Sequence, residues 1–304
     1  MITIRKVLCP SDFSEFSGRA LLYGSALSKW YGASLYLLHV VPVITQPPAK
    51  LPGFAVHPFG PEERRTLQSE LAACASPAMS AGVAVETAVV RGDPVAEILK
   101  AAATLPADLL VIGTHGRGGF EHLVLGSVTE KVLRKAVCPV LAVPPQAGPP
   151  KAEEPLLFRH ILCPVDFSEA SVRAVEQAFS LAEETDARIT LMHAVEGYQE
   201  TEEGTPVHLR DGVLQYRDYL RDKARDLLLG LVPANATSFC RPAIEVVAGR
   251  AWREILRLCA ERGADLIVMG VYGRGPIDRM LFGSTTHQVV RQAPCPVLTI
   301  RSTA

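Results

Sequence analysis

The distribution of apolar residues predicts alternating strands and helices along the whole 304-residue chain. Short runs rich in β-branched residues alternate with longer stretches in which apolar residues follow a helical period. The runs at 108–112 (DLLVI) and 265–269 (DLIVM) are continuously apolar, as expected of parallel strands that helices cover on both faces. The pattern predicts strands at 2–9, 34–41, 83–90, 108–112, 139–143, 159–164, 188–195, 241–248, 265–269 and 296–301, and helices in the first half at 14–31, 61–81, 93–104 and 126–136.

The two halves repeat one another. Residues 7–20 (VLCPSDFSEFSGRA) match residues 161–174 (ILCPVDFSEASVRA) at an offset of 154, and residues 108–143 match 265–300 at an offset of 157. A period this long indicates a duplicated domain rather than a solenoid. We therefore expect an α/β fold of two tandem doubly wound domains, each a five-stranded parallel sheet flanked by helices.

The joint between the copies is rich in proline and charge, and has no apolar period. We expect a first domain over 1–144, a semi-extended linker over 145–157 and a second domain over 158–304. Weakly patterned segments at 42–60 and 196–210 follow the second strand of each copy. Because ligands of such sheets bind at the carboxyl ends of the strands, we expect both segments to act as lids.

Composition narrows the class of protein. Hydrophobic residues make up 48% and charged residues 21% of the chain, which is typical of a soluble globular protein. A net charge of −1 gives no positive field that would attract nucleic acid or an anionic membrane. The chain shows no secretory signal pattern and no apolar run of the roughly 18–20 residues that a membrane span needs. Its seven cysteines are scattered, which indicates reduced thiols. We expect a cytoplasmic protein.

A glycine-serine pattern follows the fourth strand of each copy. Two glycines stand three residues apart, and after nine intervening residues a Gly-Ser pair opens a helix. Glycines after a strand let backbone N–H groups approach an anion, and the unpaired N–H groups of a helix start attract negative charge. The serine hydroxyl can donate to a phosphate oxygen or reach a divalent metal. The pattern comprises Gly113, Gly116, Gly126 and Ser127, and again Gly270, Gly273, Gly283 and Ser284.

A plainer interpretation is that each glycine only shapes a strand–helix turn, and for any single glycine that interpretation is the more frequent one. The occurrence of the whole pattern twice in one structural position favours a phosphate cradle. Other nucleotide signatures are absent from the sequence, which has no G-x₄-G-K-[ST] and no G-x-G-x-x-G after the first strand.

Together these segments make the chain resemble a tandem universal stress protein. The resemblance rests on CPSDFSE and CPVDFSE after the first strands, LLHVV and LMHAV at the second strands, and the two glycine-serine segments followed by CPVL. It implies a Rossmann-like fold of the adenine-nucleotide α-hydrolase type. It also implies ATP as ligand, with or without Mg or Mn, because the family branch that does not bind ATP lacks the glycine pattern.

In the ATP-binding branch, the acidic residue after the first strand and the end of the second strand contact adenosine, and the glycine-serine loop holds the phosphates. Carried over by position, the resemblance implicates Asp12, Val40, Gly113, Gly116, Gly126, Ser127 and Val128 in the first copy, and Asp166, Ala194, Gly270, Gly273, Gly283, Ser284 and Thr285 in the second. The second copy departs from the pattern where Tyr272 replaces His115 and Pro276 replaces Gly119. We rank the first site above the second.

Several residues have a structural explanation beside the functional one. Asp12 and Asp166 are either turn formers or ribose or adenine contacts. The histidines that end the second strands, and the repeated Cys-Pro pairs, are typical of buried core residues. An arginine of each loop either pairs with the triphosphate or lies on the surface. These residues are His39 and His193, Cys9, Cys163, Cys138 and Cys295, and Arg117 and Arg274; Ser14 and Ser168 are predicted helix N-caps.

Three functions are open from the sequence. The first is an ATP-binding stress-response module that changes shape or partners with its ligand. The second is a slow ATP hydrolase or phosphotransferase, for which no residue stands out to orient the attacking water. The third is an interaction scaffold, because in the resembling family the last strand pairs subunits. Here strands 139–143 and 296–300 would form an internal pseudo-dimer, and association of two chains into a homodimer stays open.

Overall fold

The structure is a computed structural model of the chain. It describes residues 3–43, 59–116, 125–150, 158–196, 207–236, 240–272 and 283–301, with 207–214 as backbone only. The chain divides into two compact units, Thr3–Cys138 (the first unit) and a second unit that begins at Pro139. The last strand of the first sequence copy therefore groups with the second unit.

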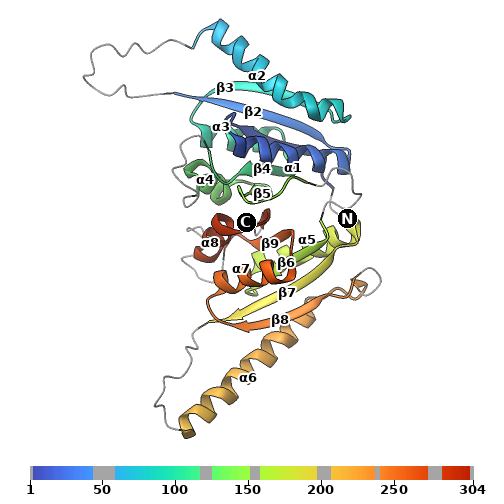
Figure 1. Cartoon of the computed structure of the whole chain (residues 1–304), viewed down its shortest axis with the longest axis vertical. Helices are drawn as coiled ribbons and strands as arrows, with labels where there is room; N and C mark the ends of the chain where they lie inside the picture. The colour runs from blue at the N-terminus through green and yellow to red at the C-terminus, as the bar shows by residue number, and fades with distance from the viewer. Residues whose placement is uncertain are drawn as a thin grey trace, which may run out of the picture. The chain divides into compact units, whose positions relative to one another are not determined.

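In the first unit, parallel strands follow the order β3-β2-β1-β4. The chain moves outward from β1 to β3 and then returns to β4 beside β1, so right-handed crossovers place the helices before and after the return on opposite faces. Figure 1 shows these helices against the strands. The elements are β1 (Lys6–Ser11), α1 (Glu15–Tyr31), β2 (Ser34–Pro42), α2 (Pro61–Ser80), β3 (Val85–Gly92), α3 (Pro94–Thr104), β4 (Leu109–Gly113) and α4 (Ser127–Lys135).

The second unit repeats this order as β8-β7-β6-β9 and adds β10 parallel to β9. Strand β5 pairs with β10 in the antiparallel direction, and Leu141 lies opposite Leu298. The α/β fold expected from the sequence is confirmed. The elements are β5 (Val140–Val143), β6 (His160–Pro164), α5 (Glu169–Thr185), β7 (Arg188–Val195), α6 (Val207–Gly230), β8 (Ala243–Ala248), α7 (Ala251–Arg262), β9 (Leu266–Gly270), α8 (Ser284–Gln292) and β10 (Val297–Ile300).

The core of each unit lies on both faces of its sheet. Leu110 and Val111 of β4 are fully buried, as are Ile267 and Val268 of β9. This burial explains why the two runs are continuously apolar, since each strand packs against helices on both sides. At the start of each first helix, Ser14 accepts a hydrogen bond from the Ser17 amide and Ser168 accepts one from the Ser171 amide, which confirms both predicted N-caps.

The segments expected to be weakly structured are shorter than predicted. Strand β2 extends through Pro42, and α6 begins at Val207 rather than after residue 210. No helix range was predicted for this part of the second copy, where charged residues and Gly212 interrupt the apolar pattern. The proposed lids fall largely on 44–58 and 197–206, outside the described residues. In the expected linker, the described part turns between Pro144 and Ala147, where Ala147 is 1% exposed, while Gln146, Gly148 and Pro149 are exposed.

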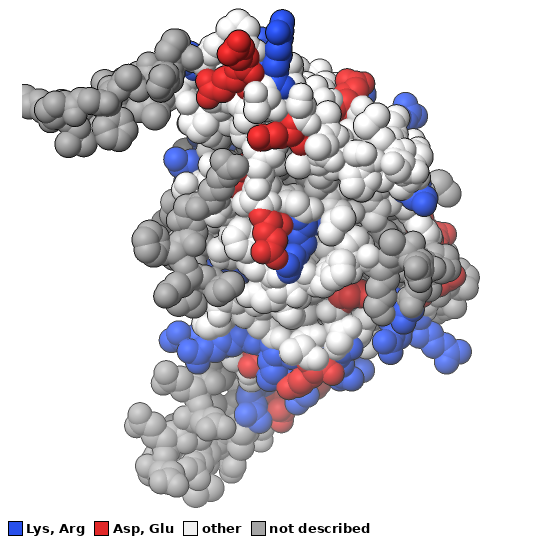
Figure 2. Space-filling model, turned by 45° about the horizontal axis from the view of Figure 1, so that its top comes forward, with Lys and Arg blue, Asp and Glu red and all other residues white. Residues whose placement is uncertain are grey.

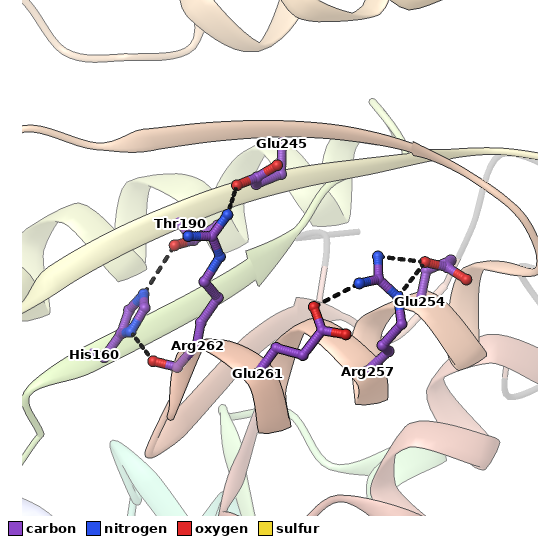
Figure 3. Close-up of polar contacts among 7 residues, drawn as sticks. All are labelled: His160, Thr190, Glu245, Glu254, Arg257, Glu261 and Arg262. Carbon is purple, nitrogen blue, oxygen red and sulfur yellow. Dashed lines mark hydrogen bonds and ion pairs between the residues drawn. The ribbon is translucent and has the colours of Figure 1, made fainter.

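Polar contacts hold the amino-terminal edge of the second sheet (Figure 3). His160 Nδ1 donates to the Arg262 carbonyl oxygen at 3.0 Å, which leaves Nε2 to accept from Thr190 Oγ1 at 2.8 Å. The Arg262 guanidinium pairs with Glu245, and Arg257 pairs with Glu254 and Glu261. The Arg262 contacts tie the end of α7 to β6 and β8, and His160 links β6 to β7, while the Arg257 pairs lie within α7.

The surface carries no dominant charge on the face that Figure 2 displays, where acidic and basic side chains are interspersed. This agrees with the net charge of −1. In the part of the chain that the structure describes, no helix has both the length and the hydropathy to cross a bilayer.

Candidate functional site

The candidate site of each unit lies where the strand order reverses. β1 and β4 are neighbours in the first unit, and β6 and β9 are neighbours in the second. The helices that leave two such strands go to opposite faces, so a crevice opens beyond their carboxyl ends. The residues that follow β1 and β4, from Asp12 and from Gly113 onward, therefore meet at one edge of the sheet.

A strained turn follows the first strand of each unit. Phe13 and Phe167 both have a φ of 62°, in the left-handed region that a bulky side chain rarely adopts. Each ring packs on the histidine that lies near the end of the neighbouring strand. The ring centroids are 4.4 Å apart for Phe13 and His39, and 4.8 Å apart for Phe167 and His193. Strain of this kind concentrates at ligand sites, where the surrounding structure maintains it.

Asp12 holds this turn and also lies at the site. Its Oδ1 accepts hydrogen bonds from the Ser14 amide at 3.0 Å and the Ser14 hydroxyl at 2.5 Å. A Cβ on Gly116 would lie 2.8 Å from the other oxygen, Oδ2, so that oxygen faces the glycine loop. Asp166 repeats the turn, with Ser168 donating at 3.0 and 2.6 Å. The turn-forming role and a place at the site are therefore combined in one side chain.

Gly113 and Gly270 have a packing reason to be glycine, in addition to the anion access expected from the sequence. A Cβ on Gly113 would lie 2.9 Å from the Phe16 carbonyl oxygen, and a Cβ on Gly270 would lie 2.9 Å from the Ser171 amide nitrogen. Backbone atoms of α1 and α5 thus occupy the space that a side chain would need. At these two positions the close approach is between helix and strand, which brings the first helix tightly against the end of the fourth strand.

The start of α4 presents its amides without a side-chain cap. Gly126 is the N-cap residue and has no side chain that could accept from the first N–H groups. Its own amide donates to the Thr114 carbonyl oxygen at 2.8 Å, which fixes the helix start beside the end of β4. In the second unit, Gly283 is the N-cap of α8 in the same way. Both helix starts are electropositive.

A cavity of about 880 Å³ in the first unit, the first cavity, collects all the sequence-predicted residues of that copy. Besides them it is lined by ends of the neighbouring strands and by the start of α3, including Pro94 and Ile98. Its volume lies within the range of about 300–1,000 Å³ that is usual for small-molecule sites. The predicted residues on its wall are Asp12, Val40, Gly113, Gly116, Gly126, Ser127 and Val128.

The equivalent cavity in the second unit, the second cavity, is smaller, at about 360 Å³. Tyr272 lines it, and the Tyr272 hydroxyl lies 3.2 Å from an Arg301 guanidinium nitrogen. Glu196 also lines it, and its Oε1 accepts from the Ala251 amide at the start of α7 at 2.6 Å. The predicted residues on its wall are Asp166, Ala194, Gly270, Gly283, Ser284 and Thr285, while Gly273 lies outside the described residues.

The histidines at the second strands are held by the backbone, as the structural explanation predicts. His39 Nδ1 and His193 Nδ1 each donate to a carbonyl oxygen, of Ser11 and Val165 respectively, at 2.7 Å. Each ring also lines its cavity. His115 is 6% exposed and its Nδ1 lies 2.9 Å from Thr114 Oγ1. These rings form cavity walls in fixed orientations.

The cysteines of the repeated Cys-Pro pairs are core residues. Cys9 and Cys163 are fully buried, and burial raises the pKa of Cys9 to about 12. Burial also raises the pKa of Cys163, and raises that of Cys138 to about 11. Such thiols stay protonated at neutral pH and act as small apolar side chains.

Four loop residues singled out in the sequence lie outside the described residues. They are Arg117 and Arg274, with Gly119 and Pro276.

Both copies match a known protein family. The sequence profile of the Universal stress protein family matches residues 3–144 and matches again over residues 157–301. The chain belongs to this family. The double match confirms that the protein is a tandem universal stress protein, as its glycine-serine segments and CP-DFSE segments indicated.

Some relatives match one copy of the repeat, and others match both copies. A universal stress protein of Methanocaldococcus jannaschii is 34% identical over 141 residues, which are 46% of this chain and 81% of the relative. One of Mycobacterium bovis is 25% identical over 305 residues, 95% of each chain. The crystal structure of a universal stress protein from Archaeoglobus fulgidus has a TM-score of 0.70 at 24% identity, and covers 97% of this chain and 96% of that one. That structure shows the same tandem fold.

Two buried threonines belong to the site region but were not predicted from the sequence. Thr129 Oγ1 donates to the Gly113 carbonyl oxygen at 2.7 Å, and Thr286 Oγ1 donates to that of Gly270 at 3.1 Å. Each hydrogen bond ties the first turn of α4 or α8 to the end of the preceding strand, β4 or β9. The repeat in the sequence could have indicated both threonines, because each stands two residues after the serine of the Gly-Ser pair.

Proposed function

We propose that this universal stress protein binds ATP in the first cavity and, more weakly, in the second, and responds to it as a stress-response module. The observation that carries the proposal is that one cavity collects every residue assigned from the ATP-binding branch in the first copy. Those residues come from strand ends and a helix start that are far apart in sequence. Their convergence is what a single ligand would require.

The chemistry of the first cavity fits a nucleoside triphosphate. The amides of Ser127 and Val128 open α4, where the positive end of the helix would hold phosphate oxygens. Ile98 and Leu125 supply apolar wall for a flat base. Asp12 would accept from ribose hydroxyls through the oxygen that faces the glycine loop. The near-neutral net charge of the chain does not prevent phosphate binding, because backbone dipoles at the site attract the anion.

Each remaining residue has a proposed part. Val40, at the end of β2, would contact adenine, and Gly116 leaves room for the Asp12 carboxylate at the cavity wall, because a Cβ there would lie 2.8 Å from Oδ2. The Ser127 hydroxyl would donate to a phosphate oxygen or reach an Mg or Mn ion that accompanies the nucleotide. The described residues contain no group of three His, Cys, Asp or Glu side chains that could hold a metal.

The second cavity is proposed as the weaker site. It has less than half the volume of the first, and its equivalent of Pro42 is Glu196, a carboxylate placed on the start of α7. That carboxylate takes up one of the helix-start amides and adds negative charge to the cavity wall. Both effects oppose binding of a highly anionic ligand, while the cradle at the start of α8 still favours it.

We also propose that the two copies form an internal pseudo-dimer through their last strands. The antiparallel pairing of β5 with β10 supports this, as does the burial of Leu141 and Leu298 at 2% and 8% exposed. Pairing of this kind covers the free edge of β10. A side-chain hydrogen bond adds to the pairing of these two strands, because Thr299 Oγ1 donates to the Val140 carbonyl oxygen at 3.1 Å.

Calorimetric titration of nucleotide-stripped protein with ATP tests the ATP proposal. Ser127→Asp places a carboxylate at the first residue of α4, where it stabilises the helix but repels phosphate. We expect it to weaken the tighter binding event by roughly 10-fold to 100-fold, without lowering the unfolding temperature. Ser284→Asp is the matched control, and should leave the tighter event unchanged. Equal binding by wild type and Ser127→Asp would contradict a phosphate site at α4.

A further inference from the structure

Two thiols of the second unit lie in contact inside the protein. Cys259 belongs to α7 and Cys295 lies just before β10, and their sulfur atoms are 3.5 Å apart. Cys259 is 1% exposed and Cys295 is 5% exposed. The contact joins residues 36 positions apart in sequence, so it is made by the fold rather than by local chain geometry.

The fold of the repeat does not require this pair. The first copy has Cys138 at the position of Cys295, but Ala102 at the position of Cys259. Ala102 is as buried as Cys259, at 1% exposed, so a small side chain satisfies the packing there. The second sulfur is therefore an addition to the repeat that packing alone does not explain.

The contact shifts the pKa values of the two sulfurs in opposite directions. A hydrogen bond with Cys295 lowers the pKa of Cys259, whereas the contact with Cys259, together with burial, raises that of Cys295. Cys259 is therefore the sulfur that gives up its proton more readily, although in the thiol form it also donates to the Ala264 carbonyl oxygen at 3.6 Å, and either sulfur can donate to the other. A thiolate next to a protonated thiol is the arrangement from which a disulfide forms, because the thiolate is the nucleophile.

We propose that Cys259 and Cys295 are an oxidisable dithiol that a hydroperoxide converts into a disulfide within the second unit. The Cys259 thiolate attacks one peroxide oxygen, the O–O bond breaks, and a sulfenic acid and hydroxide result. The Cys295 sulfur then attacks the Cys259 sulfur, a bond forms between the sulfurs, and its proton and the departing hydroxyl leave as water. Overall, two thiols and one hydrogen peroxide give one disulfide and two waters.

The disulfide would link the wall of the second cavity to the paired strands. A bond length of about 2.05 Å requires the sulfurs, now 3.5 Å apart, to approach by about 1.5 Å. Ile255 lies one helical turn before Cys259, and both Ile255 and Ala251 line the second cavity. Oxidation would thus fasten α7 to the segment that enters β10. The proposal does not depend on nucleotide binding.

Oxidation of the full-length protein, followed by peptide mapping, tests the proposal. The protein is treated with hydrogen peroxide, free thiols are alkylated under denaturing conditions, and non-reduced peptides are identified by mass spectrometry. We expect an intramolecular peptide pair that contains Cys259 and Cys295, about two mass units lighter than the two thiols and released by a reductant. We also expect the oxidised protein to melt roughly 5–10 °C higher.

Variants taken from the repeat itself serve as controls. Cys259→Ala introduces the residue that the first copy carries, and should abolish both the cross-link and the rise in melting temperature. Cys138→Ser should leave both unchanged. Ala102→Cys recreates the pair in the first copy and should add a cross-link between positions 102 and 138. Separately alkylated Cys259 and Cys295 in the oxidised wild type, or cross-links between chains, would overturn the proposal.

Discussion

At the scale of single residues, the glycine that ends β4 at the candidate site has a packing role. Gly113 lets the Phe16 carbonyl oxygen approach, since a Cβ would come within 2.9 Å of it. Gly18, by contrast, lies in α1 with nothing within 4 Å of a Cβ. The same residue type is thus required at one position and replaceable at the other.

Gly113→Ala should therefore destabilise the first unit, and Gly18→Ala should stabilise it. In the first variant the methyl group meets a backbone atom of α1 and forces the helix to shift, at a cost of about 1–3 kcal/mol. In the second, alanine replaces glycine inside a helix, which is worth about 0.5–1 kcal/mol. Urea denaturation measures both. Changes of the same sign in the two variants would show that helix–strand contact does not explain Gly113.

His160 gives the second unit a dependence on pH. Burial is the main cause that lowers the pKa of His160 below its ordinary value of 6.5. The positive charges of Arg188 and Arg262 lower that pKa further. Below pH 6.5 the unfolded chain binds a proton that the folded chain does not. The contribution of His160 to the unfolding free energy is therefore complete above that pH and falls as the pH drops toward the folded pKa.

Stability measured between pH 7.5 and 5 checks this. We expect the wild type to lose stability on acidification at no more than about 1.4 kcal/mol per pH unit from this group. His160→Gln keeps a donor and an acceptor at the site but does not titrate, so its curve should be flatter. Parallel curves for the two proteins would mean that His160 does not carry the dependence.

At the scale of elements, the start of α4 is fixed to the end of β4 by two hydrogen bonds. The Gly126 amide donates to Thr114, and the buried Thr129 hydroxyl donates to Gly113 at 2.7 Å. The helix that offers its amides to the first cavity is thereby held beside the strand that ends there. We infer that the Thr129 contact maintains the shape of the cradle.

Thr129→Val removes this bond and keeps the shape of the side chain. The Gly113 carbonyl oxygen then lacks a buried donor, and we expect a loss of about 1–2 kcal/mol in the free energy of unfolding. Weaker ATP binding should accompany it. Thr286→Val in the second unit is the counterpart, and should leave the tighter ATP site unaffected. Denaturation and calorimetry on both variants separate these effects; full stability in Thr129→Val would contradict the inference.

The helices and strands were largely predictable, because the spacing of apolar residues and the internal repeat both indicate which positions are buried. The glycine-serine pattern, together with the family resemblance that supplied Asp12, Val40 and Val128, indicated residues of the first copy that line one cavity. The Glu196–Ala251 contact was not predictable, since it joins positions 55 residues apart without a counterpart in the first copy. The packing role of Gly113 was likewise missed, because a sequence does not reveal which backbone atom approaches a glycine.

At the scale of the whole molecule, the division into units does not follow the division into copies. β5 belongs to the first copy by sequence, yet it groups with the second unit and pairs with β10. Without β5, the edge of β10 would be open for pairing with another strand. The strand thus completes the second unit as well as ending the first copy.

Fragments of the chain test this consequence. We expect residues 158–304 to self-associate through the exposed edge of β10, and residues 139–304, in which β5 covers that edge, not to associate through it. Light scattering over a range of concentrations measures both. A monomeric 158–304 fragment with a native circular dichroism spectrum would show that β5 is not needed to cover that edge.

The number of ATP molecules bound per chain tests the central claim most directly. Nucleotide-stripped full-length protein is dialysed to equilibrium against ATP up to millimolar concentration, and bound nucleotide is quantified after denaturation. The account predicts one ATP per chain at low concentration and a rise toward two as the second cavity fills. Absence of bound ATP at millimolar concentration would contradict it.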